Sequence, residues 1–273
     1  MYVVKQSMNL IYYACGSLMQ LLPFPSYLQF VLSPSFGLIV CACVLFKMNH
    51  RCRCFVTTGI VKPIVNRLFE LAYRRTREEA LRALDGIISH DALLNEADVI
   101  RVLEVGIGSG ANFKHIHRAF RLVAVEPNLL QQKIMLKALE EFPNITLESV
   151  ITTVGESMPM VPSESVDAVV TTHVLCSVTD VRQVLSEVQR VLVPGGKLIF
   201  VEHVSYPDGT LAFVIQRALE PIAYLTNCPC DLRRRSDDAI LEAGFSSVSM
   251  TEAYVPLLSV FQRHIYGVAT KDT

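Results

Sequence analysis

A glycine-rich turn is the first feature of this sequence that could bind a ligand. It reads Glu104-Val-Gly106-Ile-Gly108-Ser-Gly110 and follows an apolar, strand-like run at residues 100–105. Glycines permit a tight turn and let a ligand approach the backbone closely. The acidic Glu104 would repel a pyrophosphate and attract a cationic amino-acid group. The turn therefore favours a positively charged ligand over a dinucleotide, whose usual fingerprint is GxGxxG and not the GxGxG found here.

Three features together carry a family resemblance: the GxGxG spacing, the acidic residue before it, and Pro194-Gly195-Gly196 just before a later strand. They resemble the class I S-adenosylmethionine-dependent methyltransferases over residues 100–200. The resemblance implies that S-adenosylmethionine is the cofactor and that Glu104 and the three glycines hold it. It also implies that Glu126, at the end of the second strand, accepts the ribose hydroxyls as charge-assisted hydrogen bonds. The adenine contacts would come from the segment after the third strand, which contains Glu156, Ser157 and Met158.

Four shorter motifs narrow the resemblance to the methyltransferase-like protein 7 family: VLCSV at 174–178, RVLVPGG at 190–196, VEHV at 201–204 and HIYG at 264–267. Members of that family are alkyl thiol S-methyltransferases that an N-terminal apolar segment anchors in endoplasmic reticulum membranes and lipid droplets. The resemblance therefore implies a small lipophilic thiol as the methyl acceptor. This chain has Cys230-Asp-Leu-Arg233-Arg234 where the family has a Cys-x-Leu-Thr-Arg-like stretch. That change falls in a region expected to border the acceptor.

Two histidines at strand ends are the candidates for catalysis. A thiol with a pKa near 8.5 is only slightly ionised at neutral pH, so a general base would help to form the thiolate. His203 is the first candidate and His173 the second, each with a purely structural role as its alternative. Adjacent strand residues point to opposite faces, so Glu202 is expected to orient a loop instead. Cys176 is interpreted as a small pocket-lining or packing residue, because class I enzymes transfer the methyl group directly.

The cysteines do not predict a metal site. Cys228-Pro-Cys230 is too tight for the usual CxxC zinc spacing, and no partner ligands surround it in the sequence. The spacings of the eight cysteines suit no secreted disulfide framework. We therefore expect reduced thiols and no bound metal.

The elements that must position these residues alternate in type from residue 100 onward. Strands are expected at 100–105, 121–126, 145–150, 166–172, 197–204, 247–254 and 264–270, and helices at 111–118, 128–141, 180–192, 210–224 and 236–243. Alternation with nearly continuous apolar strands is typical of a parallel sheet covered by helices on both faces. The fold class is α/β: a seven-stranded, mostly parallel, doubly wound Rossmann-like sheet whose last two strands can form an antiparallel pair.

The N-terminal segment is strongly apolar. Only Lys5 among the Asp, Glu, Lys and Arg residues lies before position 47, and residues 27–46 are long enough to cross a membrane as one helix. The alternatives are a proline-hinged hairpin of 10–22 and 27–46 and, less favoured, a cleavable signal peptide. Expected domain boundaries are a membrane anchor with a basic collar at 1–54, an amphipathic helical linker at 55–99 and a methyltransferase domain at 100–273.

The distribution of charge limits the partners. Residues 47–80 carry a net charge of +5 and residues 81–273 a net charge of −7. An acidic domain gives no electrostatic footprint for nucleic acid. The basic residues after the apolar run favour a domain that faces the cytosol. The family resemblance implies that it lies on the endoplasmic reticulum membrane or a lipid droplet.

A thiol S-methyltransferase acting at a membrane is the leading functional hypothesis. Methylation of a quinol or a phospholipid headgroup is the alternative within the enzyme class. A non-catalytic membrane or lipid-droplet scaffold is the alternative outside it. The intact glycine turn and Glu126 argue against a scaffold, because a disused pocket would not need them.

Overall fold

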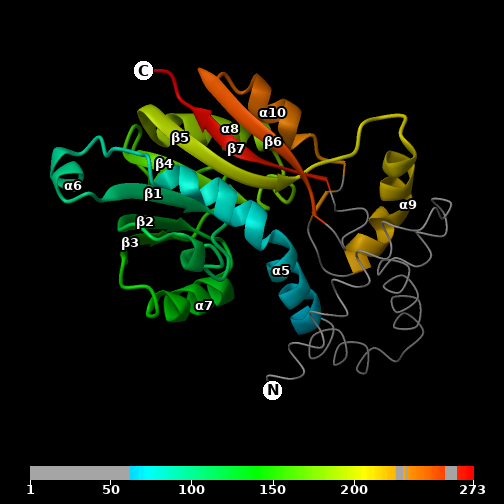
Figure 1. Ribbon diagram of the computed structural model, residues 1–273, viewed down its shortest axis with the longest axis horizontal. Coiled ribbons are helices and arrows are strands. Elements are labelled where there is room, and N and C mark those ends of the chain that lie inside the picture. The colour runs from blue at the N-terminus through cyan, green and yellow to red at the C-terminus, as the bar shows by residue number, and fades with distance from the viewer. Residues whose placement is uncertain (1–61, 226–229, 232, 256–262) are drawn as a thin grey trace.

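The structure is a computed structural model, and it describes residues 62–225, 230–231, 233–255 and 263–273. Within these residues the chain forms one mixed sheet of seven strands with helices on both of its faces (Figure 1). The strands are β1 (Ile100–Val105), β2 (Phe120–Val125), β3 (Ile145–Ile151), β4 (Val166–Thr172), β5 (Leu192–His203), β6 (Ser247–Tyr254) and β7 (Arg263–Thr270). The helices are α5 (Lys62–Leu81), α6 (Ala92–Glu96), α7 (Leu129–Leu139), α8 (Val181–Val191), α9 (Leu211–Leu225) and α10 (Ser236–Glu242), with single 3-10 turns at Arg82–Leu84 and Phe113–His115.

The strand order is β3-β2-β1-β4-β5-β7-β6. The first five strands in this order are parallel, and β7 runs antiparallel to both β5 and β6. The order reverses between β1 and β4, which are neighbours although β2 and β3 separate them in the sequence. In open α/β sheets, ligands bind at the carboxyl ends of the strands beside such a reversal. The loops after β1, β2, β4 and β5 are therefore the place to look for a site.

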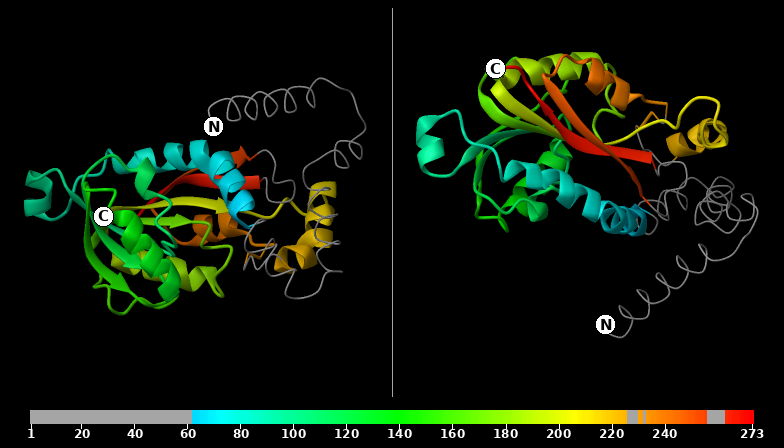
Figure 2. Two further views of the ribbon diagram at one scale, coloured as in Figure 1. Left: turned by 90° about the horizontal axis from the view of Figure 1, so that it is seen from below. Right: turned by 45° about the horizontal axis from the view of Figure 1, so that its top comes forward.

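Two apolar clusters pack the sheet between its helical layers. The cluster on one face joins the buried end of α5 (Ala80, Leu81) to Met135 of α7 and to the sheet. The cluster on the other face includes Val184 and Val188 of α8 and Ile240 of α10. Figure 2 shows these helices on opposite sides of the strands. The central strands β1, β4 and β5 are nearly continuously buried because both faces are covered, as the apolar runs predicted.

The predicted strands and most predicted helices are confirmed, but the helix expected at 111–118 is wrong. Only a single 3-10 turn forms, at Phe113–His115. Gly110 lies at φ +77°, and the amide of Asn112 donates hydrogen bonds to side chains on β1 and β4. These residues therefore close the glycine loop onto the sheet, and the backbone turns extended at Ile116. The sheet is also more mixed than expected, because β7 pairs antiparallel with two strands.

The amphipathic stretch predicted from residue 62 to 84 forms α5 and the 3-10 turn after it. One face of it packs on the domain, where Tyr73, Ala80 and Leu81 are buried. The apolar run at 10–46 and the basic residues up to 54 lie outside the described residues. Within the described part, no helix combines the length and apolar character that crossing a bilayer requires.

Candidate active site at the carboxyl ends of the parallel strands

The glycine loop lies where the sheet order predicts a ligand site. Gly106, Gly108 and Gly110 have φ values of +62°, +56° and +77°, a backbone region that other residues rarely adopt. A Cβ on Gly106 would come within 2.8 Å of a methyl carbon of Val174, which follows β4. A Cβ on Gly108 would instead project into open space, with no side-chain atom within 4 Å. The loop therefore packs against the β4 loop at Gly106 and leaves its backbone open to a ligand at Gly108.

Glu104 lies on β1 beneath this loop and is almost completely buried. Its carboxylate accepts a hydrogen bond of 2.8 Å from the Asn112 amide, which also donates to the Thr172 hydroxyl at 2.8 Å. Burial raises the pKa of Glu104 to about 8, against the smaller opposite effects of the Asn112 bond and the positive charge of Arg77. The carboxyl group therefore stabilises a neighbouring cation only when it gives up its proton.

Glu126 follows β2 and faces the same loop. One carboxylate oxygen accepts a hydrogen bond from the Gly108 N–H at 2.9 Å, and the other accepts one from the Asn128 N–H at 2.9 Å. Each oxygen keeps a further acceptor position. The side chain is thus fixed beside the open part of the glycine loop with unused acceptor capacity.

Glu156, Ser157 and Met158 lie after β3, and the structure gives them different surroundings. Glu156 accepts a hydrogen bond from the Thr179 N–H at 2.7 Å, and Ser157 is exposed. Met158 is fully buried in the apolar core beside α8, and its N–H donates to Glu187. Its side chain therefore packs in the core.

Three histidines come together near the end of β4, the end of β5 and the start of β7: His173, His203 and His264. His203 pairs with His264 across β5 and β7, and the ring centroids of His173 and His264 lie 5.4 Å apart. Tyr73 of α5 covers this group, with its ring centroid 4.4 Å from that of His173. Burial, and then the neighbouring positive or titratable side chains His264, Arg77 and His203, hold the pKa of His173 well below its usual range. His173 is therefore neutral near pH 7.

Glu202 holds the loop after β4, as predicted. Its completely buried carboxylate accepts hydrogen bonds from the N–H groups of Val174 and Leu175, at 3.2 and 3.1 Å. Burial raises its pKa to about 7, opposed by these two bonds. This contact sets the path of the chain into Cys176.

Sequence reasoning missed the neighbours of Cys176. Its sulfur lies 3.6 Å from the sulfur of Cys230, and both lie close to His203. The expectation that no partner ligands surround Cys230 considered sequence neighbours only, whereas Cys176 and His203 are 54 and 27 residues away in the sequence. Asn112, Tyr73 and His264 were also missed. The positions of Asn112, immediately after the glycines, and of His264, within HIYG, were the available signals.

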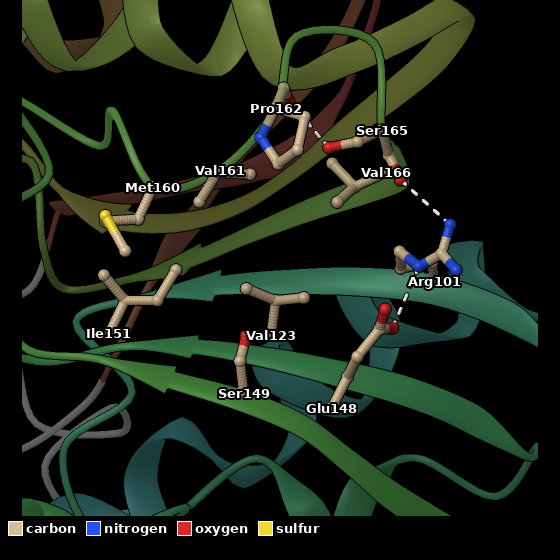
Figure 3. Close-up of a pocket in the computed structure, with 10 residues that line it drawn as sticks. All are labelled: Arg101, Val123, Glu148, Ser149, Ile151, Met160, Val161, Pro162, Ser165 and Val166. Carbon is tan, nitrogen blue, oxygen red and sulfur yellow. Dashed lines mark hydrogen bonds and ion pairs between the residues drawn. The ribbon is translucent and has the colours of Figure 1, made fainter.

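A separate pocket of about 290 Å³ lies against β1, β2 and β3. Figure 3 shows Arg101 paired with Glu148 at one end and Met160 at the other. None of its lining residues belongs to the glycine loop, Glu126 or the histidine group. We therefore assign the ligand site to the carboxyl ends of the strands and not to this pocket.

This strand order, with a glycine loop after β1 and a carboxylate after β2, defines a class I methyltransferase. A family model described as a methyltransferase domain matches residues 103–200. Human thiol S-methyltransferase TMT1A is 38% identical over 173 residues, covering 63% of this chain and 71% of that protein. Rat thiol S-methyltransferase TMT1B is 40% identical over 180 residues, covering 66% and 74%. The chain therefore belongs to the family of the thiol S-methyltransferases TMT1A and TMT1B.

A solved structure supports the fold. Geranyl diphosphate C-methyltransferase from Streptomyces coelicolor A3(2) superposes with a TM-score of 0.53 at 13% identity, covering 72% of this chain and 76% of that one. This likeness concerns the fold alone, since the identity is low.

Proposed function

We propose that this protein is an S-adenosylmethionine-dependent thiol S-methyltransferase. The observation that carries this conclusion is its identity of about two residues in five with relatives of that name, over 173 to 180 residues. The geometry agrees with this proposal, because the residues proposed to bind the cofactor lie around the loop after β1, at the carboxyl ends of the parallel strands.

The residues present fit S-adenosylmethionine. Gly108 leaves a space that a Cβ would fill, so the backbone can approach a ligand there. Glu126 offers its remaining acceptor positions to the ribose hydroxyls, and Glu104 lies beneath the loop where it can balance the charge of the amino-acid ammonium group. The oxygen of the buried Asn112 amide has no hydrogen-bond partner among the described residues, so it can accept from that ammonium group. When bound, the cofactor supplies an electrophilic methyl group on a sulfonium.

The acceptor end of the site is largely buried. Cys176 and His203 are buried at the ends of β4 and β5, beside the loop that packs on Gly106. Methylation of a thiolate turns an anion and a cation into two neutral products, and a site that excludes water favours this loss of charge. Glu202 keeps the loop in place through two backbone N–H groups. The burial of this end thus suits a small lipophilic thiol.

We also propose that the protein acts at a membrane, on the endoplasmic reticulum or a lipid droplet, with the enzyme domain facing the cytosol. Residues 10–46, which contain no ionisable side chain except cysteine and tyrosine, support this proposal. Extraction of cell membranes with alkaline carbonate tests it. A protein retained in the pellet supports attachment, and one released into the supernatant contradicts it.

The test of function is release of S-adenosylhomocysteine from membranes that contain the full chain. Each assay holds S-adenosylmethionine and one acceptor: an alkyl thiol, a quinol or a phospholipid. We expect release with the thiol alone, and background release from the Glu126→Ala variant. Release with only the quinol or the phospholipid would show that the acceptor is not a thiol and would leave the cofactor assignment unchanged. If the protein binds the cofactor but releases no S-adenosylhomocysteine with any of the three acceptors, the result would favour a non-catalytic scaffold.

A further inference from the structure

Three potential metal ligands from separate segments meet beside the proposed acceptor site. Cys176 lies in the loop after β4, His203 ends β5, and Cys230 lies in the segment that leads to α10. One ligand atom from each, two sulfurs and a ring nitrogen, lie within 4.8 Å of one another. We call these three residues the Cys2His cluster.

The fold fixes the cluster through its backbone. The Asp231 N–H donates to the carbonyl of Cys176 at 2.8 Å, which ties the Cys230 segment to the β4 loop. Glu202 holds the same loop through the two residues before Cys176. His203 is set by its ladder position opposite His264. The cluster is therefore preorganised by contacts that do not involve its own ligand atoms.

The spacing of the sulfurs suits a shared metal ion. Two thiolates on one tetrahedral zinc, each at about 2.3 Å from it, lie about 3.8 Å apart. The two sulfurs here are 3.6 Å apart, whereas a disulfide requires about 2.05 Å. Sulfur and imidazole nitrogen are also the ligands that zinc prefers in proteins.

We propose that Cys176, Cys230 and His203 bind a zinc ion that takes the acceptor thiol in its fourth position. Catalytic zinc sites commonly have three protein ligands and one open position, and Cys2His is one of the known sets. Cys176 and His203 are buried while Cys230 is half-buried, so the cluster is accessible from the Cys230 side. Val174, two residues before Cys176, contacts the glycine loop, which puts the cluster next to the cofactor site.

This inference rests on the proposed function, and the zinc ion would supply the thiolate that methyl transfer requires. A thiol that coordinates zinc is deprotonated, and its proton passes to the solvent. A lone pair of the bound sulfur then forms the new S–CH3 bond while the methyl–sulfonium bond breaks, and the electrons of that bond stay on the sulfur of S-adenosylhomocysteine. The neutral thioether is a weaker ligand than the thiolate, so it leaves the metal. His203 is in this scheme a ligand and not a general base.

The test is metal binding by the full chain purified in detergent. We expect about one zinc per chain, as in a mononuclear site. Co²⁺ added to the metal-stripped protein should produce thiolate-to-cobalt charge-transfer bands together with tetrahedral d–d bands. Cys176→Ser, Cys230→Ser and His203→Gln should each lose most of the zinc and change these spectra.

Ser177→Ala is the matched control. The Ser177 hydroxyl lies 3.5 Å from the sulfur of Cys176 and 3.7 Å from that of Cys230, so removing it perturbs the packing of the cluster without removing a zinc ligand. This variant should keep its zinc and its cobalt spectrum. Addition of an alkyl thiol to the cobalt protein should shift the bands in the wild type and in Ser177→Ala.

Failure of this inference differs from failure of the proposed function. Thiol methylation by a protein that binds neither zinc nor cobalt would overturn the zinc site and leave the function intact. A disulfide between Cys176 and Cys230 in metal-free, active protein would also overturn the zinc site and leave the function intact. Zinc and the cobalt spectrum in a protein that methylates no thiol would confirm the site and overturn the function. A cobalt spectrum unchanged in Cys176→Ser and Cys230→Ser would place the metal elsewhere.

Discussion

The carboxylate of Glu126 accepts a hydrogen bond from the backbone N–H of Gly108 at 2.9 Å. This bond joins the loop after β1 to the end of β2 across the open part of the site. It fixes a charged side chain beside Gly108, where a Cβ would meet no side-chain atom within 4 Å. Because the two residues are 18 positions apart, neither motif alone indicates the contact.

Glu126→Ala should therefore weaken cofactor binding and leave the fold intact. Hydrogen bonds to a charged group contribute about 1.5–3 kcal/mol, or roughly ten- to a hundredfold in Kd. Titration calorimetry with S-adenosylhomocysteine measures the change. Glu126→Gln, which keeps one acceptor oxygen, should lose less. Glu141→Ala, an exposed carboxylate after α7, is the control and should bind normally. Unchanged affinity in Glu126→Ala would contradict the ribose assignment.

Gly108→Ala should distinguish the cost of backbone strain in the loop from the loss of cofactor binding. Gly108 and Gly209 both have positive φ, and a Cβ on either would meet no side chain. Alanine in this conformation costs roughly 1–2 kcal/mol at each position. Both variants should thus lose similar stability in thermal unfolding, but only Gly108→Ala should lose cofactor affinity. Equal affinity in the two variants would show that the ligand does not approach Gly108.

The sequence predicted the sheet because its strands depend on local signals. Apolar runs bounded by turns predicted all seven strands, and the GxGxG turn placed Gly106 and Gly108 at the correct edge. The helix expected after Gly110 failed because Asn112 bonds to Glu104 and Thr172, which are distant in sequence. Helical periodicity carries no information about such a tertiary contact.

The Cys2His cluster also depends on tertiary contacts that local sequence patterns do not reveal. Cys176, His203 and Cys230 follow no metal-binding spacing, since they come from two separate loops and the end of β5. Their meeting depends on the order β4-β5-β7 and on the hydrogen bond between Asp231 and Cys176. Only the three-dimensional arrangement could bring them together, and the sequence therefore predicted no metal.

Cofactor affinity should rise with pH up to about 8 because of Glu104. Its pKa is raised to about 8 by burial, so the carboxyl group holds a proton at pH 7 in the ligand-free protein. A bound ammonium group favours the ionised form, and binding then releases a proton. The Kd of S-adenosylhomocysteine should fall as the pH rises from about 6 to 8, by up to about tenfold per pH unit. Glu104→Gln should bind weakly at all these pH values, and a pH dependence that persisted in this variant would belong to another group.

The raised pKa of Glu104 also predicts how the stability of the ligand-free protein depends on pH. The folded chain keeps a proton on Glu104 up to pH of about 8, whereas the unfolded chain has released it above about 4.5. The unfolded state therefore binds fewer protons in this range, and the contribution of Glu104 to stability falls as the pH rises through it. Denaturant unfolding across this range should show a smaller decline for Glu104→Gln than for the wild type. An equal decline would mean that Glu104 is ionised in the folded protein.

Glu202→Ala should destabilise the protein and impair the acceptor end of the site. It would leave the buried N–H groups of Val174 and Leu175 without their acceptor, at a cost of about 2–4 kcal/mol in the free energy of unfolding. Glu242→Ala is the matched control, because that carboxylate forms a surface ion pair with Arg182, and its loss should cost less than about 1 kcal/mol. The loop that Glu202 holds contains Cys176, so the KM for the thiol should rise more than that for S-adenosylmethionine. A variant as stable as the wild type would show that other contacts fix the loop. Equal increases in both KM values would assign Glu202 to the fold of the whole site and not to the position of the acceptor.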